Sequence, residues 1–366
     1  MLTILFCFLA IMSEDLKFEI IDKILTIYPP ILLSIGLTGN ILSVIVLAQA
    51  STRKTSTGFM LIFLTVTDTL ILMNSVLVKW LSHMFEINLR TSSNGACKFH
   101  VFMSYFLFQL SPWILVLVTV ERVFSVRYPH RVRDVFTRRK VILSLLVLVL
   151  VIAGLNAHLI YGYEHVYNDL YQSLDCMVIS KHEDFMFKYW TWIDFVLAFA
   201  VPFSVLLCGN VMVIHTLQSS QNFRKASTVT THSGQELRGH LYRRENRTAS
   251  HFTSTAVVLN ITFSSLVSPF SIFAIGQPYW FPVETITPER IANLMLTGTI
   301  FLMLLHTNSA INFVLYIFCG SKFRRDLKNL FCKRRRTISE SMHNTRNFHT
   351  QSVSTVSSEG ETFMRL

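Results

Sequence analysis

The chain has 366 residues, of which 51% are hydrophobic and only 15% are charged. Soluble domains carry about 25% charged residues, so this composition argues against a soluble enzyme, a disordered protein and a small disulfide-stapled secreted protein, and it indicates lipid as the solvent. The net charge is +11, but the basic residues lie in short segments between apolar runs and near the C-terminus. They do not form one folded basic face, so no nucleic acid is expected as a partner.

Seven apolar stretches are each long enough to cross a bilayer, which takes about 20 helical residues. In chain order they are Ile27–Ala50, Phe59–Leu81, Lys98–Val126, Lys140–Gly162, Tyr189–Leu217, Thr253–Gly276 and Ile291–Cys319. They predict an all-α fold, a seven-transmembrane helix bundle over residues 27–319. Residues 1–26 precede it as an extracellular N-terminus, and their apolar start is either a signal peptide or a retained segment. Residues 320–332 predict an amphipathic eighth helix, and residues 333–366 predict a disordered cytosolic tail.

Lysine and arginine set the predicted orientation of the chain. They gather in the loops after the first, third and fifth stretches and in the C-terminal tail, whereas the opposite loops are rich in Asp and Glu. This distribution predicts a multi-pass plasma-membrane protein with its N-terminus outside and its C-terminus in the cytosol. The acidic outer side is either a solvated surface or a vestibule that attracts cations.

Ionisable residues inside a bilayer are costly, and they are functional candidates for that reason. Four stand out, namely Asp68, Glu121, Arg122 and Asp194. Asp68 lies near mid-membrane, where polar residues of other stretches can partner it: Asn40, Ser111, Asn308, Ser309 and Asn312. Such a cluster holds either a neutral hydrogen-bonded acid or a carboxylate with a small cation such as sodium, or it only fixes the packing of the helices.

The cysteines fall into different environments. Cys97 and Cys176 both lie on the predicted outer side, where a disulfide is allowed, and Cys332 follows the predicted eighth helix, a context that favours S-palmitoylation. No zinc-type histidine cluster, nucleophile elbow or phosphate-binding glycine loop occurs in the sequence. We therefore expect neither an enzyme nor a cofactor, apart from the sodium ion considered above.

Several short motifs occur in order along the stretches: Gly39-Asn40, Thr67-Asp68, Glu121-Arg122-Val123, Pro202, Pro269, Asn312-Phe313-Val314-Leu315-Tyr316 and Phe323-Arg324. Together they resemble the rhodopsin-like family of G-protein-coupled receptors over residues 33–332. Residues 113–116 and 308–313 are further similar to FMRFamide-type neuropeptide receptors of invertebrates. The chain departs from the family at Val267, Asn210 and Ala249, which puts the usual toggle tryptophan and arginine lock in doubt.

The resemblance implies a Cys97–Cys176 disulfide and a receptor that binds an extracellular neuropeptide and activates a heterotrimeric G protein. The implied coupling and activation switch comprises Glu121, Arg122, Asn210, Phe263, Pro269, Asn312 and Tyr316. The implied ligand pocket comprises Ser104, Tyr105, Phe108, Asp194, Phe270, Glu284 and His306. Further implied partners are membrane lipid, a receptor kinase and an arrestin, the last two acting at Ser and Thr residues of the tail.

The chemistry of the implied pocket favours a peptide ligand. Ser104 stands where aminergic receptors carry Asp, and His306 stands where opsins carry the retinal-binding Lys, so neither an amine nor retinal is expected. FMRFamide-type peptides end in Arg-Phe-amide, which implies an amidated, basic ligand. Asp194 either pairs with a neighbour such as Lys79, is protonated, or awaits that cationic ligand.

A small membrane transporter or channel is the alternative function. Such proteins often show internal repeats, glycine-interrupted helices or lines of intramembrane charge, and we find none of these in the sequence. Peptide-triggered guanine-nucleotide exchange would indicate a receptor, whereas ion flux without exchange would indicate a transporter.

Overall fold

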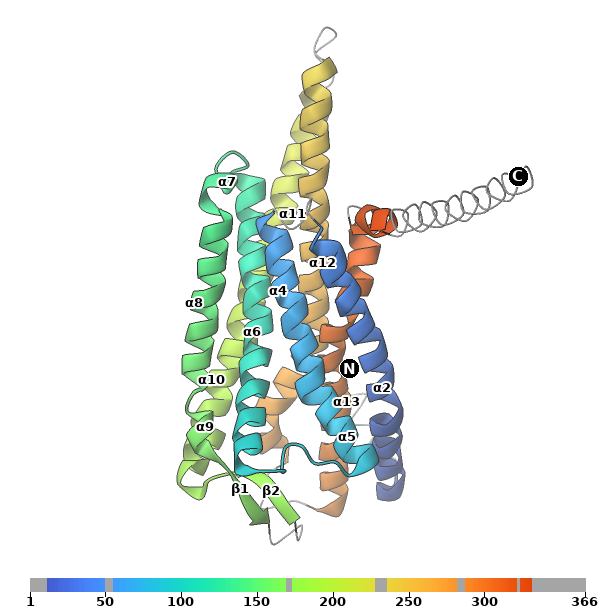
Figure 1. Ribbon diagram of the computed structural model, residues 1–366, viewed down its shortest axis with the longest axis vertical. Coiled ribbons are helices and arrows are strands. Elements are labelled where there is room, and N and C mark those ends of the chain that lie inside the picture. The colour runs from blue at the N-terminus through green and yellow to red at the C-terminus, as the bar shows by residue number, and fades with distance from the viewer. Residues whose placement is uncertain are drawn as a thin grey trace, which may run out of the picture. The chain divides into compact units, whose positions relative to one another are not determined.

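A computed structural model describes residues 12–49, 55–168, 173–227, 236–281, 287–320 and 323–330. Within these residues, seven helical segments are long and apolar enough to cross a membrane, and Figure 1 shows them running side by side as a bundle. The predicted seven-helix, all-α fold is confirmed. Residues 323–330 form a short helix in a separate unit of the chain, inside the range where the eighth helix is predicted.

The seven segments have the following bounds. They are α2 (Glu14–Leu47); α4 (Ser56–Ile71) continued by η1 (Leu72–Leu77) and α5 (Val78–Phe85); α6 (Asn94–Arg127); α8 (Arg138–Asn156) followed by α9 (Leu159–Gly162); η3 (Phe185–Trp190), α10 (Thr191–Phe195), η4 (Val196–Ala200) and α11 (Val201–Ser227); α12 (Glu236–Trp280); and α13 (Pro288–Cys319). The short α7 (Val132–Val135) lies between α6 and α8. The segments η1, η3 and η4 are π-helical.

Helix α2 begins earlier than the predicted start at Ile27. The side chain of Ser13 accepts a hydrogen bond from the Leu16 backbone N–H, and Glu14 and Asp15 occupy the first turn. A serine cap satisfies an otherwise unpaired N–H, and acidic side chains interact favourably with the positive end of the helix dipole. These polar residues extend the helix beyond its apolar part, which hydropathy alone does not detect.

Helices α2 and α13 approach each other closely at two glycines. A Cβ atom at Gly36 would lie 3.2 Å from the Ala310 Cα, and one at Gly39 would lie 2.9 Å from the Phe313 Cβ. Small residues let helix backbones approach in a membrane, where packing and hydrogen bonds replace the hydrophobic effect between helices. The approach brings Asn40 to the backbone of α13, where its Nδ2 donates to the Ser309 carbonyl at 3.2 Å.

Helix α8 shows how the bundle divides between core and lipid. Its buried residues are Val141, Leu145, Ile152 and Asn156. Most of its other aliphatic side chains are exposed, as expected for a face in contact with lipid tails. Asn156 is fully buried, so its amide must find partners inside the bundle.

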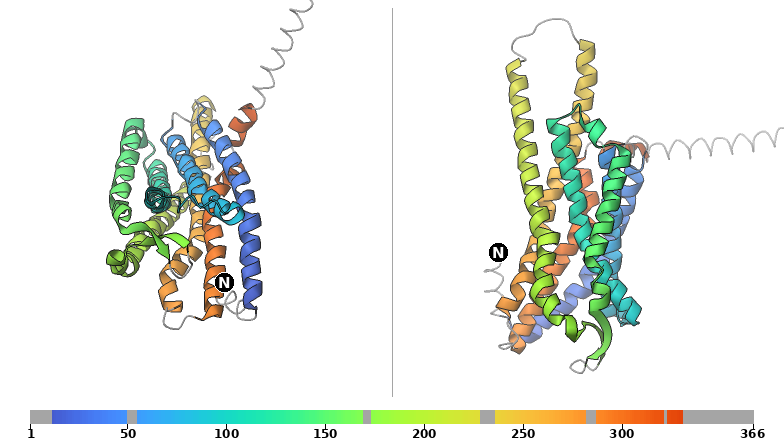
Figure 2. Two further views of the ribbon diagram at one scale, coloured as in Figure 1. Left: turned by 60° about the horizontal axis from the view of Figure 1, so that its bottom comes forward. Right: turned by 90° about the vertical axis from the view of Figure 1, so that its left-hand side faces the viewer.

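A β-hairpin lies at one end of the bundle, as the right-hand view in Figure 2 shows. Its antiparallel strands, β1 (Tyr163–Asn168) and β2 (Ser173–Val178), place His165 opposite Cys176. A disulfide joins Cys176 to Cys97 at the start of α6, with 5.5 Å between their Cα atoms. The predicted disulfide is therefore confirmed, whereas the hairpin was not predicted. We call this end of the bundle the disulfide end.

Candidate functional site

The end of the bundle opposite the hairpin holds the buried ion pair of Glu121 and Arg122. The Arg122 Nε and Nη2 atoms donate to Glu121 Oε2 and Oε1, each at 2.6 Å. The two side chains are only 4% and 7% exposed. Charge-assisted, two-point hydrogen bonds of this kind are among the strongest in proteins. The expected resting partner of Arg122 is thus in contact with it, and we call this region the arginine end.

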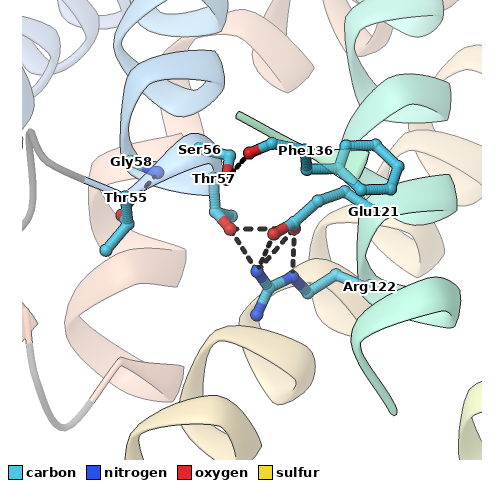
Figure 3. Close-up of polar contacts among 7 residues, drawn as sticks. All are labelled: Thr55, Ser56, Thr57, Gly58, Glu121, Arg122 and Phe136. Carbon is cyan, nitrogen blue, oxygen red and sulfur yellow. Dashed lines mark hydrogen bonds and ion pairs between the residues drawn. The ribbon is translucent and has the colours of Figure 1, made fainter. Parts of the chain in front are cut away.

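A third residue completes this group (Figure 3). The Thr57 hydroxyl donates to Glu121 Oε2 at 2.8 Å, and it accepts from Arg122 Nη2. Thr57 is held in the first turn of α4, because Thr55 caps that turn by accepting from the Gly58 N–H at 3.1 Å. The Ser56 hydroxyl also donates to the Phe136 carbonyl at 3.0 Å. Sequence reasoning missed Thr57, since a threonine at the start of a helix reads only as a capping residue.

Asn210 lies in a second buried polar group, formed by α6, α11 and α12. The Asn260 amide donates to Thr119 Oγ1 at 2.9 Å and to Asn210 Oδ1 at 2.8 Å. Gly209 makes this possible, because a Cβ there would lie 2.4 Å from the Thr119 Cγ2. Asn210 was expected beside Arg122 in an active state, and in this structure it holds α12 instead. Asn260 and Thr119 were not predicted.

The other predicted switch residues belong to α12 and α13. Phe263 and Tyr316 are each 2% exposed, and Val267, which replaces the tryptophan that the resemblance implies, is buried. Pro269 lies inside α12. A proline cannot donate the helical hydrogen bond at its position, so it weakens the helix there. The structure thus places packing groups and a candidate hinge on one helix.

The Asp68 network forms in part. Asp68 is fully buried, Ser111 Oγ donates to its Oδ1 at 3.1 Å, and Asn312 Nδ2 donates to its Oδ2 at 2.6 Å. The Ser309 side chain also forms a hydrogen bond with Asp68. Asn40 Nδ2 donates to the Ser309 carbonyl, and Asn40 Oδ1 is buried without a hydrogen-bond partner within the described residues. Asn308 is buried next to Ser309 in the sequence, and among the described residues no hydrogen bond joins it to the group. The carboxylate, the hydroxyl and the unpartnered amide oxygen are ligand types that suit a small hard cation.

The predicted pocket residues separate into groups near the disulfide end. Tyr105 packs against Trp190 with 6.2 Å between ring centroids, and Phe108 meets the buried His306 edge to face at 5.5 Å. Ser104 accepts from Asn74 Nδ2 at 2.9 Å. Phe270 packs in a different aromatic cluster, with Phe273, Phe281 and Phe301. Glu284 lies outside the described residues.

Asp194 is paired with an amide and not with a base. Gln109 Nε2 donates to Asp194 Oδ1 at 2.7 Å, and Asn156 Nδ2 donates to Gln109 Oε1 at 2.7 Å. No ion pair joins Asp194 to Lys79 among the residues that the structure covers. Of the alternatives drawn from the sequence, the ion pair with Lys79 is therefore wrong. Gln109 and Asn156 were not predicted, because a lone amide in an apolar stretch has no distinguishing pattern.

A negative and a positive side chain, Asp194 and Arg90, both affect the pKa of Tyr163, the first residue after α9. Burial raises the pKa of the Tyr163 hydroxyl, and the negative charge of Asp194 adds to that rise, whereas a hydrogen bond with Tyr105 and the positive charge of Arg90 oppose it. Arg90 is anchored by a hydrogen bond of 2.7 Å from its Nη2 to the Cys176 carbonyl. Arg90 and Asp194 thus act in opposite directions on the pKa of Tyr163.

Comparison with known protein families identifies the architecture around these groups. Residues 39–316 match the family described as 7 transmembrane receptor (rhodopsin family). The matched range includes Asn40, Asp68, the disulfide, the Glu121–Arg122 pair and Tyr316. The geometry and the family match therefore cover the same part of the chain.

Proposed function

We propose that this chain, which belongs to the rhodopsin family of seven-transmembrane receptors, binds an extracellular neuropeptide at the disulfide end and activates a heterotrimeric G protein at the arginine end. The observation that carries the proposal is the buried Thr57–Glu121–Arg122 group. Burying a charge pair costs desolvation free energy. An exchange of partners by Arg122 during signalling would explain why the pair is present. The disulfide and the Lys and Arg distribution support an outward disulfide end and a plasma-membrane location.

In the proposed mechanism the peptide binds an active conformation more tightly than the resting one, and so shifts a two-state equilibrium. Helix α12 moves at Pro269, Phe263 repacks, and the Asn260 bonds to Thr119 and Asn210 break. Asn210 and Tyr316 then replace Glu121 as partners of Arg122, which becomes accessible to the G protein. Asn312 links this switch to the buried Asp68, since its amide contacts that carboxylate.

The proposed ligand is basic and amidated. Asp194, with Glu284 as a second candidate, would meet its cationic side chain, and Tyr105 and Phe108 offer an aromatic surface to its phenyl ring. Ser104, His306 and Phe270 complete the proposed pocket, although Phe270 lies in the separate cluster described above. In an Arg-Phe-amide terminus, the arginine would meet the Asp194 carboxylate and the phenylalanine would meet the aromatic rings.

The function is tested by measuring guanine-nucleotide exchange on purified heterotrimers in membranes that contain the receptor. Phe-Met-Arg-Phe-amide and a library of other amidated neuropeptides serve as ligands, and the free-acid forms serve as controls. We expect at least one amidated peptide to accelerate exchange and its free acid to be weaker. Peptide-triggered ion flux without exchange would support the transporter alternative instead.

Sodium is a proposed allosteric ligand of the Asp68 network. The ion would be held by Asp68 with Asn40, Ser111, Asn308, Ser309 and Asn312, and its positive charge would stabilise the Asp68 carboxylate in the resting state. We expect sodium chloride to lower agonist affinity relative to choline chloride at equal ionic strength, and we expect Asp68→Asn to remove this difference. Competition binding measures both effects. Equal sodium sensitivity in the wild type and in Asp68→Asn would reject the site.

Signal termination is proposed to use the C-terminal tail. A receptor kinase would phosphorylate tail residues and an arrestin would bind them, because each phosphate adds about −1.5 to −2 charges. The candidate sites are Thr337, Ser339, Ser341, Ser352, Ser354, Thr355, Ser357 and Ser358. These residues, and the proposed lipidation site Cys332, lie outside the described part of the chain.

A further inference from the structure

Three hydrogen-bonded side chains connect helices α8, α6 and α10. The line starts at the Ile152 carbonyl, which accepts from Asn156 Nδ2 at 2.9 Å. The same Nδ2 donates to Gln109 Oε1, and Gln109 Nε2 donates to Asp194 Oδ1, each at 2.7 Å. Asn156 is 0% exposed and Gln109 is 1% exposed. Two buried amides therefore lead from a main-chain carbonyl to one carboxyl group.

The start of this line fixes the direction of every hydrogen bond in it. A backbone carbonyl only accepts, so Asn156 must turn its NH₂ group toward Ile152. The other hydrogen of that NH₂ points to Gln109, which must therefore present its oxygen to Asn156 and its NH₂ to Asp194. An N–H that donates to a carboxyl oxygen favours the ionised form of the acid. The line thus keeps Asp194 as an acceptor.

The surroundings of Asp194 leave its second oxygen available. Within the described chain, no hydrogen bond or ion pair reaches Oδ2, and the side chain is half-buried. Asp194 lies in α10, five residues between the π-helical segments η3 and η4. π-Helical turns change the direction of the side chains around them and are frequent at functional sites. Trp190, four residues before Asp194 in the same helical segment, packs with Cys97 and Cys176, which places this carboxylate toward the disulfide end.

We propose that Gln109 and Asn156 are positioning residues that hold Asp194 ionised and oriented, so that its free oxygen selects ligands with a cationic guanidinium or ammonium group. This inference rests on the proposed ligand-binding function. It adds two buried residues, Gln109 and Asn156, that do not touch the ligand. By keeping Asp194 ionised, they determine which ligand charge the receptor prefers. Gln109 already donates to Asp194 Oδ1, so Oδ2 is the oxygen left without competition for the cation. Ammonium and guanidinium groups can both donate to it, so the selection is for positive charge.

The first test compares Phe-Met-Arg-Phe-amide with the same peptide carrying citrulline, which has the shape of arginine without its charge. A charge-assisted hydrogen bond predicts a preference for the arginine peptide of roughly ten- to a hundredfold in the wild type. Asp194→Asn should abolish this preference, and Gln109→Leu and Asn156→Leu should each reduce it. The affinity for the citrulline peptide should stay nearly constant. Ser144→Ala, an exposed position on α8 that bonds only to its own helix, is the control and should keep the full preference.

The ratio of the two affinities separates positioning from folding. A merely structural role of Gln109 or Asn156 would weaken both peptides equally and leave the ratio unchanged, which would overturn the inference. Asn156→Asp supplies a second variant, because a carboxyl group of the same size cannot donate the two hydrogens that the Asn156 amide gives to Ile152 and Gln109. It should also lower the preference.

A second measurement does not depend on the ligand. Infrared difference spectra of the purified receptor, wild type minus Asp194→Asn, distinguish a carboxylate from a protonated carboxyl group. At neutral pH we expect a carboxylate in the wild type and a larger protonated fraction in Gln109→Leu. A protonated Asp194 in the wild type, or an unchanged spectrum in Gln109→Leu, would overturn the inference. If the spectra agree with it and neither peptide binds, the proposed peptide ligand is wrong and the positioning role stands.

Discussion

Arg122→Ala is expected to abolish ligand-triggered nucleotide exchange while ligand affinity stays within a few-fold of the wild type. The resting contacts explain the first part, because Arg122 is the cation that holds Glu121 and Thr57 in one buried group. The ligand is proposed to bind at the other end of the bundle, which explains the second part. Arg122→Ala also leaves the Glu121 carboxylate buried, and of this group only Thr57 still bonds to it. Breaking a buried pair in this way costs about 3–5 kcal/mol, so thermal stability should fall as well.

The control for this experiment is Arg127→Ala. Arg127 lies at the end of the same helix, is exposed, and stacks 6.0 Å from the centroid of the Tyr128 ring. Its removal tests the loss of a positive charge without the loss of the buried pair, and exchange should be nearly normal. Thr57→Val keeps the shape of the side chain and removes its hydroxyl, so it should loosen the resting group and raise exchange in the absence of ligand. Full ligand-triggered exchange in Arg122→Ala would contradict the proposed switch.

The two parts of this switch differ in how well the sequence predicts them. Glu121 and Arg122 are charged residues inside an apolar stretch, where charges are costly, so the sequence marks them as functional candidates. Because they are adjacent, a contact between them is expected. Thr57 and Asn260 are uncharged, and both fall in ordinary helical positions. Their roles depend on how far each helix is rotated and shifted against α6, and a single sequence does not contain that information.

The same reasoning applies to the fold. The apolar stretches predict seven helices because each must satisfy its own backbone hydrogen bonds in lipid. Their ends are less predictable, as the start of α2 at Glu14 shows, because caps and dipole interactions extend a helix beyond its apolar part. The π-helical segments around Asp194 and the Gln109–Asn156 contact depend on tertiary packing, so the sequence identified the acid and not the residues that hold it.

Cys97→Ser is expected to remove high-affinity binding of the amidated peptide. Cys97 is 0% exposed and Cys176 is 2% exposed, and both pack with Val101, Leu159, Met186 and Trp190. The bridge closes a loop between cysteines 79 residues apart in sequence, and a crosslink of that span stabilises a protein by about 4.5 kcal/mol in the loop-entropy description. Without it the hairpin loses its covalent attachment to α6. The Cys176 carbonyl would then no longer be fixed as the acceptor for Arg90.

Because the two cysteines act as one bridge, Cys176→Ser and the double variant should lose binding to the same degree as Cys97→Ser. Additive losses would mean that the side chains contribute separately, and not through the disulfide. The control is Cys208→Ser, since Cys208 is a free and exposed thiol of α11, and it should bind like the wild type. Peptide maps of the mature receptor, with and without reductant, should contain a crosslinked Cys97–Cys176 pair only before reduction. Two free thiols at these positions, together with normal peptide binding, would show that the ligand site at this end of the bundle forms without the bridge.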